Sequence, residues 1–230
     1  MRWLALLPLL LIAASAPQQK TYLVSGFDRV RVDGPYQVDI VRGPVSASAE
    51  GDTKALDRLD VRVDGSTLVI GAGTQGWELR AGESIAAPRV TLSTPVLSAV
   101  TVNGGGTVRI AEMRVPRASL AINGPGTIAI AAFDADDLNA TMIGAGTLTI
   151  AGTARHIRVR SNGAGSFDGT GFMANDAMLI SESSGLMRLG VRYTAQVMAL
   201  GVGTVHLDGA PECTISGGGP VECAGKVIRR

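Results

Sequence analysis

The chain has 230 residues, of which 30 are glycine and only 4% are aromatic. Glycine is well above its usual share of about 7%, and a core poor in rings must be built from small and β-branched side chains. Lysine and arginine number 21 against 20 aspartates and glutamates, which gives a net charge of +1. This balance gives no electrostatic reason to expect nucleic acid or anionic lipid as a partner.

The first sixteen residues predict an export signal. Arg2 provides the positive start, residues 4–14 (LALLPLLLIAA) the apolar core, and a small-residue cleavage site ends at Ala16. Pro17 disfavours a cut directly before it, so cleavage one or two residues earlier is an alternative. A retained membrane anchor is a second alternative, although the apolar run is shorter than the ~20 residues that a spanning helix needs. We expect the rest of the chain, residues 17–230, to form a single exported β-repeat domain.

Two segments in the N-terminal portion, about residues 22–90, predict pairs of strands. Residues 30–40 (VRVDGPYQVDI) place alternating apolar residues on both sides of a turn that contains Tyr36. Residues 61–70 (VRVDGSTLVI) contain Asp64-Gly65, which is a strong signal for a short hairpin. This portion is therefore compatible with an ordinary antiparallel sheet.

A glycine-rich turn recurs through the remaining regular repeats, about residues 90–228. Residues 101–110 (TVNGGGTVRI), 121–130 (AINGPGTIAI) and 141–150 (TMIGAGTLTI) are near-copies spaced twenty residues apart. Later copies follow at slightly shorter intervals. The turn glycines are Gly104, Gly106, Gly124, Gly126, Gly144, Gly146, Gly163, Gly165, Gly185, Gly201, Gly203, Gly217 and Gly219.

Apolar residues alternate on both sides of each turn, which predicts strands with one buried face. In the last unit, this alignment places Cys213 and Ile215 level with Val197 and Ala199. Each unit is then a strand, a glycine turn, a second strand and a longer connection such as residues 111–119. Stacked units of this kind share one long core and form a β-solenoid, in which glycine provides positive φ or close approach of backbones. A string of hairpins that closes into a sandwich is the alternative.

The same alignment stacks Asn103 on Asn123 in neighbouring layers, as in asparagine ladders. Ile143 interrupts this column, and Asn162 resumes it.

The repeats resemble the head GIN domain of putative autotransporter adhesins. The resemblance rests on the start FDRVRVDGPYQVDI (residues 27–40), the serial Asn/Ile-Gly-x-Gly-Thr/Ser units and the closing GAPECTISGGGPVE (residues 209–222). It covers about residues 22–228 and implies a right-handed β-solenoid at the bacterial cell envelope. It implies no catalytic or ligand-binding residue.

No catalytic, cofactor-binding or metal-binding site is predicted from the sequence. The glycine turns lack the third glycine of a dinucleotide fingerprint and the Gly-Lys-Ser/Thr of a P-loop. His156 and His206 have no ligand partner at metal-binding spacing and are expected on the outside of strands. The residues weighed and set aside are Asp168 for calcium, the acidic run Asp134, Asp136 and Asp137 for acid–base catalysis, and Trp77 for sugar stacking.

The two cysteines, Cys213 and Cys223, lie ten residues apart across the last turn. In an exported protein this spacing indicates a disulfide. A pair of free buried thiols is the alternative.

These observations favour a non-catalytic envelope or surface protein with an adhesin-like binding face. It would be periplasmic, surface-bound or secreted, and its partner would be an unidentified envelope protein or glycan. Self-association into a homo-oligomer is compatible with the pattern. A polysaccharide-acting enzyme and an envelope-stress sensor or scaffold are the alternatives.

Overall fold

The computed structural model describes residues 18–73 and 86–229. The predicted export signal and Trp77 lie outside these residues. The described chain is nearly all strand and contains one short helix. Its elements are β1 (Gln18–Tyr22), β2 (Arg29–Asp33), β3 (Gln37–Arg42), β4 (Ser46–Gly51), α1 (Thr53–Arg58), β5 (Leu59–Asp64), β6 (Thr67–Ala72), β7 (Arg89–Thr94), β8 (Ala99–Asn103), β9 (Thr107–Asn123), β10 (Thr127–Gly144), β11 (Thr147–Gly163), β12 (Ser166–Ser183), β13 (Met187–Ala199), β14 (Val205–Gly209), β15 (Glu212–Ser216), β16 (Val221–Cys223) and β17 (Lys226–Arg229).

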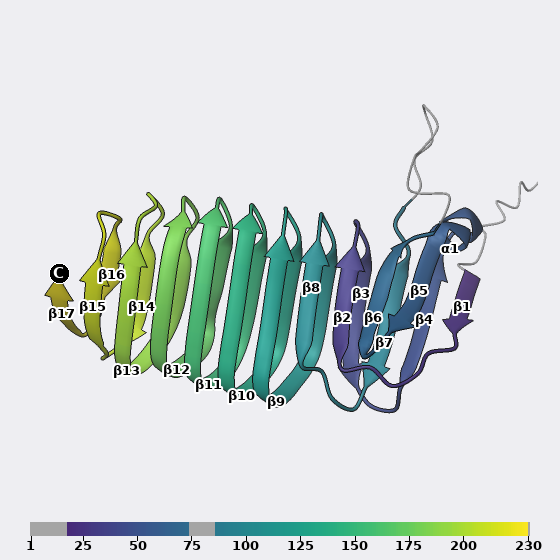
Figure 1. Ribbon diagram of the computed structural model, residues 1–230, viewed down its shortest axis with the longest axis horizontal. Helices are drawn as coiled ribbons and strands as arrows, with labels where there is room; N and C mark the ends of the chain where they lie inside the picture. Colours follow the sequence, from purple (N-terminus) through teal and green to yellow (C-terminus); the bar gives the residue numbers. More distant parts are fainter. Residues whose placement is uncertain (1–17, 74–85, 230) are drawn as a thin grey trace, which may run out of the picture.

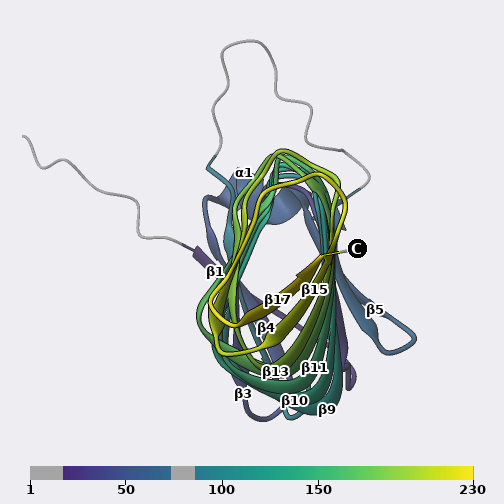
Figure 2. The same cartoon turned by 90° about the vertical axis from the view of Figure 1, so that its left-hand side faces the viewer.

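The chain winds into a β-solenoid of about six turns (Figure 1). Strands β9 to β13 pair in parallel, and Thr107, Thr127 and Thr147 occupy the same position in successive layers. Viewed along its length, the stack is an elongated coil whose layers superimpose (Figure 2). The twenty-residue period of the sequence is therefore one coil, and the predicted solenoid is confirmed.

The glycine turns are corners of the coil and not hairpin loops. Strand β8 precedes the turn that leads into β9, yet Ala99 pairs with Ser119, one layer further on. The residue after the turn, Thr107, pairs with Gln37 and Thr127 in the layers on either side. The two sides of one turn are thus bonded to neighbouring layers instead of to each other, which excludes the sandwich of hairpins.

The connection expected at residues 111–119 is not a loop, and this part of the prediction is wrong. Strand β9 continues through it, bends, and pairs with β10 along both of its halves. Met113, Val115 and Ala118 are buried inside the bend. Because the segment keeps an inward-facing set of apolar side chains, the parallel ladder continues around the corner.

The predicted register of Cys213 and Ile215 against the preceding layer is also wrong, by two residues. Cys213 pairs with Ala195, and Ile215 pairs with Val197. Ile215 pairs with Val197, and Val221 pairs with Val205. The last turn, from Ile215 to Val221, is therefore two residues shorter than the turn before it, from Val197 to Val205. A shift of two keeps both side chains facing inward, so their predicted burial still holds.

The N-terminal portion is antiparallel only in part. Strand β4 pairs antiparallel with β1 and β7, and β5 forms an antiparallel hairpin with β6. The hairpin turns at Gly65, whose φ of 60° suits glycine. Strands β2 and β3, however, pair in parallel with their neighbours. Their coil is inserted between the layer of β6 and β7 and the layer of β8 and β9.

The interior is built from stacked columns of apolar side chains, most of them aliphatic. One column has at most 2% exposure in every layer and comprises Val108, Ile128, Leu148, Phe167, Met187 and Val205. Burial of a side chain of this size contributes roughly 1.5–3 kcal/mol, so the repeated column is a principal source of stability. Within the described ranges, no helix is long and apolar enough to cross a bilayer.

Candidate functional site

The turn glycines are required by the stacking of the layers. Gly104, Gly124, Gly144, Gly163 and Gly217 have φ between 89° and 115°, which favours glycine. At the second glycine of a turn, a side chain is excluded by lack of space. A Cβ on Gly126 would lie 2.7 Å from the carbonyl oxygen of Gly104 and 2.6 Å from a methyl carbon of Val102. These turns therefore hold backbones close together and give no cradle for a phosphate.

The remaining turn glycines are placed in the same way. Those without positive φ, which include Gly185, Gly201 and Gly203, lie against the backbone of the preceding layer. Gly106, Gly146, Gly165 and Gly219 do so as well.

The histidines lie on outward-facing positions of the strands. His156 is exposed, and its Nδ1 lies 3.5 Å from Asp176 one layer away. His206 is half-buried, with Nδ1 2.8 Å from Glu222 and Nε2 3.1 Å from Asp208. No cluster of three or more potential metal ligands occurs in the described part of the chain.

Two carboxyl groups near the C-terminal layers have perturbed acidity. Arg188 Nε donates to Asp208 Oδ2 across one layer at 2.9 Å, and this hydrogen bond lowers the pKa of Asp208. The same bond raises the pKa of Arg188. Asp168 accepts hydrogen bonds from the hydroxyl and the amide of Thr170, which lower its pKa. Both carboxylates are held in their charged form, the opposite of what a general acid requires.

The acidic run does not form a catalytic pair. Asp134 lies 3.5 Å from Arg114, Asp136 lies 3.0 Å from Arg155, and Asp137 lies 3.9 Å from Arg117. These carboxylates are part of β10, where each meets an arginine on a neighbouring strand or layer. Their arrangement is that of charge ladders on a solvated surface.

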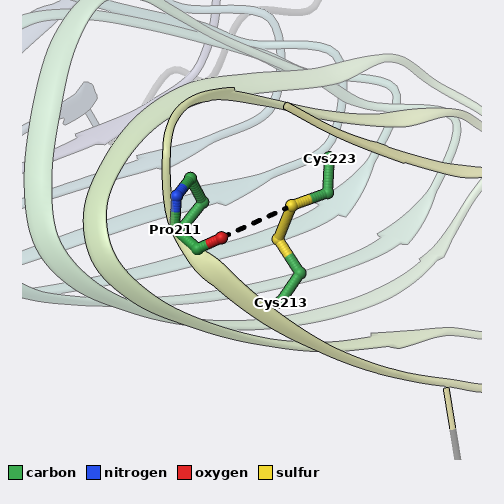
Figure 3. The surroundings of a disulfide bond; sticks show 3 residues. All are labelled: Pro211, Cys213 and Cys223. Atoms are coloured by element: carbon green, nitrogen blue, oxygen red, sulfur yellow. Dashed lines mark hydrogen bonds between the residues drawn. A yellow bond between two sulfur atoms is a disulfide. The ribbon is translucent and has the colours of Figure 1, made fainter. Parts of the chain in front are cut away.

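Cys213 and Cys223 form a disulfide, as predicted (Figure 3). Their Cα atoms are 6.6 Å apart, and Cys213 is fully buried beneath the last layers. Cys223 Sγ lies 4.0 Å from the carbonyl oxygen of Pro211. This is a packing contact, because a disulfide sulfur has no proton to donate. The disulfide fastens β15 to β16 at the end of the solenoid.

One outer side of the solenoid carries a regular surface that differs from the rest. It consists of two adjacent columns of outward side chains on β2, β8 to β13 and β15, and we call it the arginine face. None of its sixteen residues is buried, and none is acidic, lysine or aromatic. The first column is Arg29, Ala99, Ser119, Asn139, Arg158, Met178, Gln196 and Thr214, and the second is Arg31, Thr101, Ala121, Thr141, Arg160, Ile180, Met198 and Ser216.

Acidic residues are confined to the two margins of the arginine face. On one margin, Asp33 accepts hydrogen bonds from Arg31 and from Asn103. Glu182 lies on the same margin and accepts from Asn162 at 2.8 Å. On the opposite margin, Asp137 and Asp176 are engaged by Arg117, His156 and Thr194. The centre of the face is therefore free of negative charge.

The face is hollowed along its length. A depression of about 590 Å³ is lined by Asn139, Arg158 and Met178 together with the margin residues His156 and Asp176. A second depression, of about 290 Å³, continues from Met178 across Ile180 and Met198. Such open depressions on a regular sheet are suited to an extended or flat partner.

The arginine face was not predicted from the sequence. Its signal was present, because the units aligned by their turn glycines already place Ala99, Ser119, Asn139 and Arg158 in one column. Continuation of that column to Met178 would have shown the change from polar to apolar residues.

A stack of coils that each contact only their neighbours defines the class of β-solenoid repeat proteins. The chain belongs to the family described as "Putative auto-transporter adhesin, head GIN domain", whose model matches residues 26–211. The predicted family is thus confirmed. No curated protein matches the chain by sequence.

Several solved structures have a similar fold. A putative adhesin from Bacteroides fragilis has a TM-score of 0.79 at 17% identity, covering 94% of this chain and 98% of that one. A putative adhesin from Parabacteroides merdae has a TM-score of 0.65 at 12% identity, with coverages of 94% and 97%. A putative adhesin from Parabacteroides distasonis has a TM-score of 0.62 at 14% identity, with coverages of 93% and 97%. At these identities the similarity shows the fold.

Proposed function

We propose that this chain is an exported, non-catalytic binding protein of the bacterial cell envelope or surface, and that the arginine face is its binding surface. The observation that carries the proposal is the pair Arg158 and Arg160, which lie at the centre of a long, acid-free and partly apolar face and have no ion-pair partner among residues 18–73 and 86–229. Unpaired charge beside exposed apolar side chains is typical of a surface that meets a partner.

Three further observations support this proposal. The family and the similar structures carry the description of putative adhesins. Asp134, Asp136 and Asp208, which could serve as acids or bases, are each tied to an arginine. The disulfide at the C-terminal end suits an oxidising compartment outside the cytoplasm. The partner would be a component of the envelope, and self-association through the same face is a competing outcome.

The test uses residues 17–230 purified from the periplasm, labelled with a fluorophore, and mixed with envelope fragments of the source cells. We expect saturable binding that weakens strongly when Arg158→Glu and Arg160→Glu are introduced together. Arg62→Glu with Arg89→Glu, at the N-terminal end of the stack, is the matched control and is expected to bind normally. Equal binding by both variants would contradict the assignment of the face. Cell fractionation and the N-terminal mass of the mature chain test export.

A further inference from the structure

The C-terminal half of the arginine face is amphipathic across successive layers. Arg158 and Arg160 project side by side from β11. The next layer places Met178 level with Arg158, and Ile180 level with Arg160. Met198 then follows Ile180 in the layer after that. Positive charge and apolar surface are thus separated by a single strand spacing of about 4.8 Å.

The two arginines lack a counter-ion within the described protein. Along the stack, Arg158 has Asn139 and Met178 as neighbours, and Arg160 has Thr141 and Ile180. The nearest acids belong to the margins, where Glu182 accepts from Asn162 and Asp176 accepts from Thr194 at 2.6 Å. Two like charges on alternate residues of one strand repel each other, so an external anion would relieve the repulsion.

Large apolar side chains are exposed on the C-terminal part of the face and beside it. Met178 is 39% exposed, Met198 is 44% exposed, and Leu200, just beyond the end of β13, is 57% exposed. Val202 in the following turn is 82% exposed. These side chains extend the face towards the glycine turns of the C-terminal layers and form one apolar rim beside the arginines.

The chemistry of the face selects among partners. A small soluble anion would pair with the arginines and leave the apolar rim uncovered. A glycan is disfavoured because the sixteen residues of the face contain no aromatic ring on which a sugar could stack. Addition of a peptide strand needs a free sheet edge, whereas β11 and β12 are paired on both sides. A bilayer interface meets both requirements, because it presents phosphates next to acyl chains.

We propose that the arginine face docks on the surface of a bilayer that contains anionic phospholipid. Arg158 and Arg160 contact lipid phosphates, and Met178, Met198 and Leu200 enter the boundary between headgroups and acyl chains. The net charge of +1 gave no electrostatic reason to expect such a partner, because it averages over the whole surface. The local surface differs, since its acids lie at the margins and not among the sixteen residues of the face. This inference rests on the proposed function and names the partner of the same face.

The experiment is co-flotation of the mature chain, residues 17–230, with vesicles of phosphatidylcholine containing 30% phosphatidylglycerol or none. We expect binding to the anionic vesicles and little to the neutral ones. Each arginine near an anionic surface is worth about a fivefold change in affinity. Arg158→Gln with Arg160→Gln should therefore weaken binding roughly 20- to 30-fold. Met178→Ser with Met198→Ser should weaken binding to the same vesicles while leaving its dependence on salt unchanged.

Arg62→Gln with Arg89→Gln removes the same charge at the N-terminal end and should bind like the wild type. Circular dichroism of every variant establishes that the fold is kept. Equal binding to neutral and anionic vesicles, or equal loss in the control variant, would overturn the proposal. So would binding to soluble polyglutamate without binding to vesicles, which would indicate an acidic polypeptide as partner. Binding to envelope fragments that survives lipid extraction, with no vesicle binding, would refute the lipid partner and leave the proposed function standing. Failure in both assays would refute both.

Discussion

Asn123 Nδ2 donates a hydrogen bond of 2.9 Å to Asn103 Oδ1, twenty residues earlier in the chain and one layer away. Asn103 in turn donates to Asp33 at 2.6 Å, so the ladder reaches back into the inserted N-terminal coil. The predicted stacking of the two asparagines is thereby confirmed. The ladder stops at Ile143 and resumes where Asn162 bonds to Glu182.

Replacement of Ile143 by asparagine should join the two parts of this ladder. The residue lies between Asn123 and Asn162 in register, and its apolar side chain is 53% exposed. A side-chain hydrogen bond contributes about 0.5–1.5 kcal/mol net, and less where it is solvated. We expect Ile143→Asn to raise the thermal midpoint by one to a few degrees. Ile143→Ala is the control, because it removes the apolar surface without adding an amide. An equal gain in both variants would contradict the ladder.

Two glycines in the turns of neighbouring layers provide a sharp test of the packing argument. A Cβ at position 126 would lie 2.7 Å from the carbonyl oxygen of Gly104, whereas a Cβ at Gly105 would meet nothing within 4 Å. We expect Gly126→Ala to destabilise the chain by roughly 2–4 kcal/mol, since backbone must move. Gly105→Ala should be neutral or stabilising by up to about 1 kcal/mol. Urea denaturation of both variants checks this, and similar midpoints for the two would refute it.

Removal of the disulfide should loosen the C-terminal layers first. For a loop of ten residues the chain-entropy model gives about 2–3 kcal/mol. The layer of β16 and β17 has a neighbour on one side, so it is able to open without the rest. We expect Cys213→Ser with Cys223→Ser to lose hydrogen-exchange protection in β14 to β17, while β10 and β11 stay protected.

Thiol titration of the wild type provides the control for that variant. Two titratable thiols in non-reduced protein from the periplasm would rule out the bridge there. A uniform loss of protection along the chain would mean that the layers unfold as one unit.

The pair Asp208 and Arg188 predicts a dependence of stability on pH. The hydrogen bond from Arg188 lowers the pKa of folded Asp208 below its unfolded value of about 3.9. Its contribution is therefore complete above that unfolded value and is lost as the pH falls through the folded pKa. Asp208→Asn should lower the urea midpoint slightly at pH 7, and the difference from wild type should shrink at pH below about 3.9. Arg188→Gln should remove the same pH-dependent part, and an Asp208→Asn effect that persists unchanged in acid would contradict the assignment.

The period of the sequence was sufficient to predict the coil, the inward columns and the hairpin at Gly65, because alternation and glycine placement are local properties. Three features required information that lies outside a single unit. The chain stays in strand conformation through the bend at Met113 only because the next layer pairs with it. The register of Cys213 depends on the length of the last turn, whose glycines resemble those of the earlier turns. The arginine face arises from the succession of Arg158, Met178 and their neighbours across layers, and is visible only after the register is known.

In sequence, β2 and β3 precede β6 to β9. In the stack, however, their coil lies between the layer of β6 and β7 and the layer of β8 and β9. Arg29 pairs with Thr67 on one side and with Ala99 on the other. During synthesis from the N-terminus, the partners of this coil emerge much later than the coil itself, whereas each central coil has its neighbour about twenty residues away. Closure of the longer loops costs more entropy, so we expect the central coils to assemble first. Deletion of residues 29–42 would then leave a gap inside the stack, whereas deletion of residues 210–230 would only shorten it.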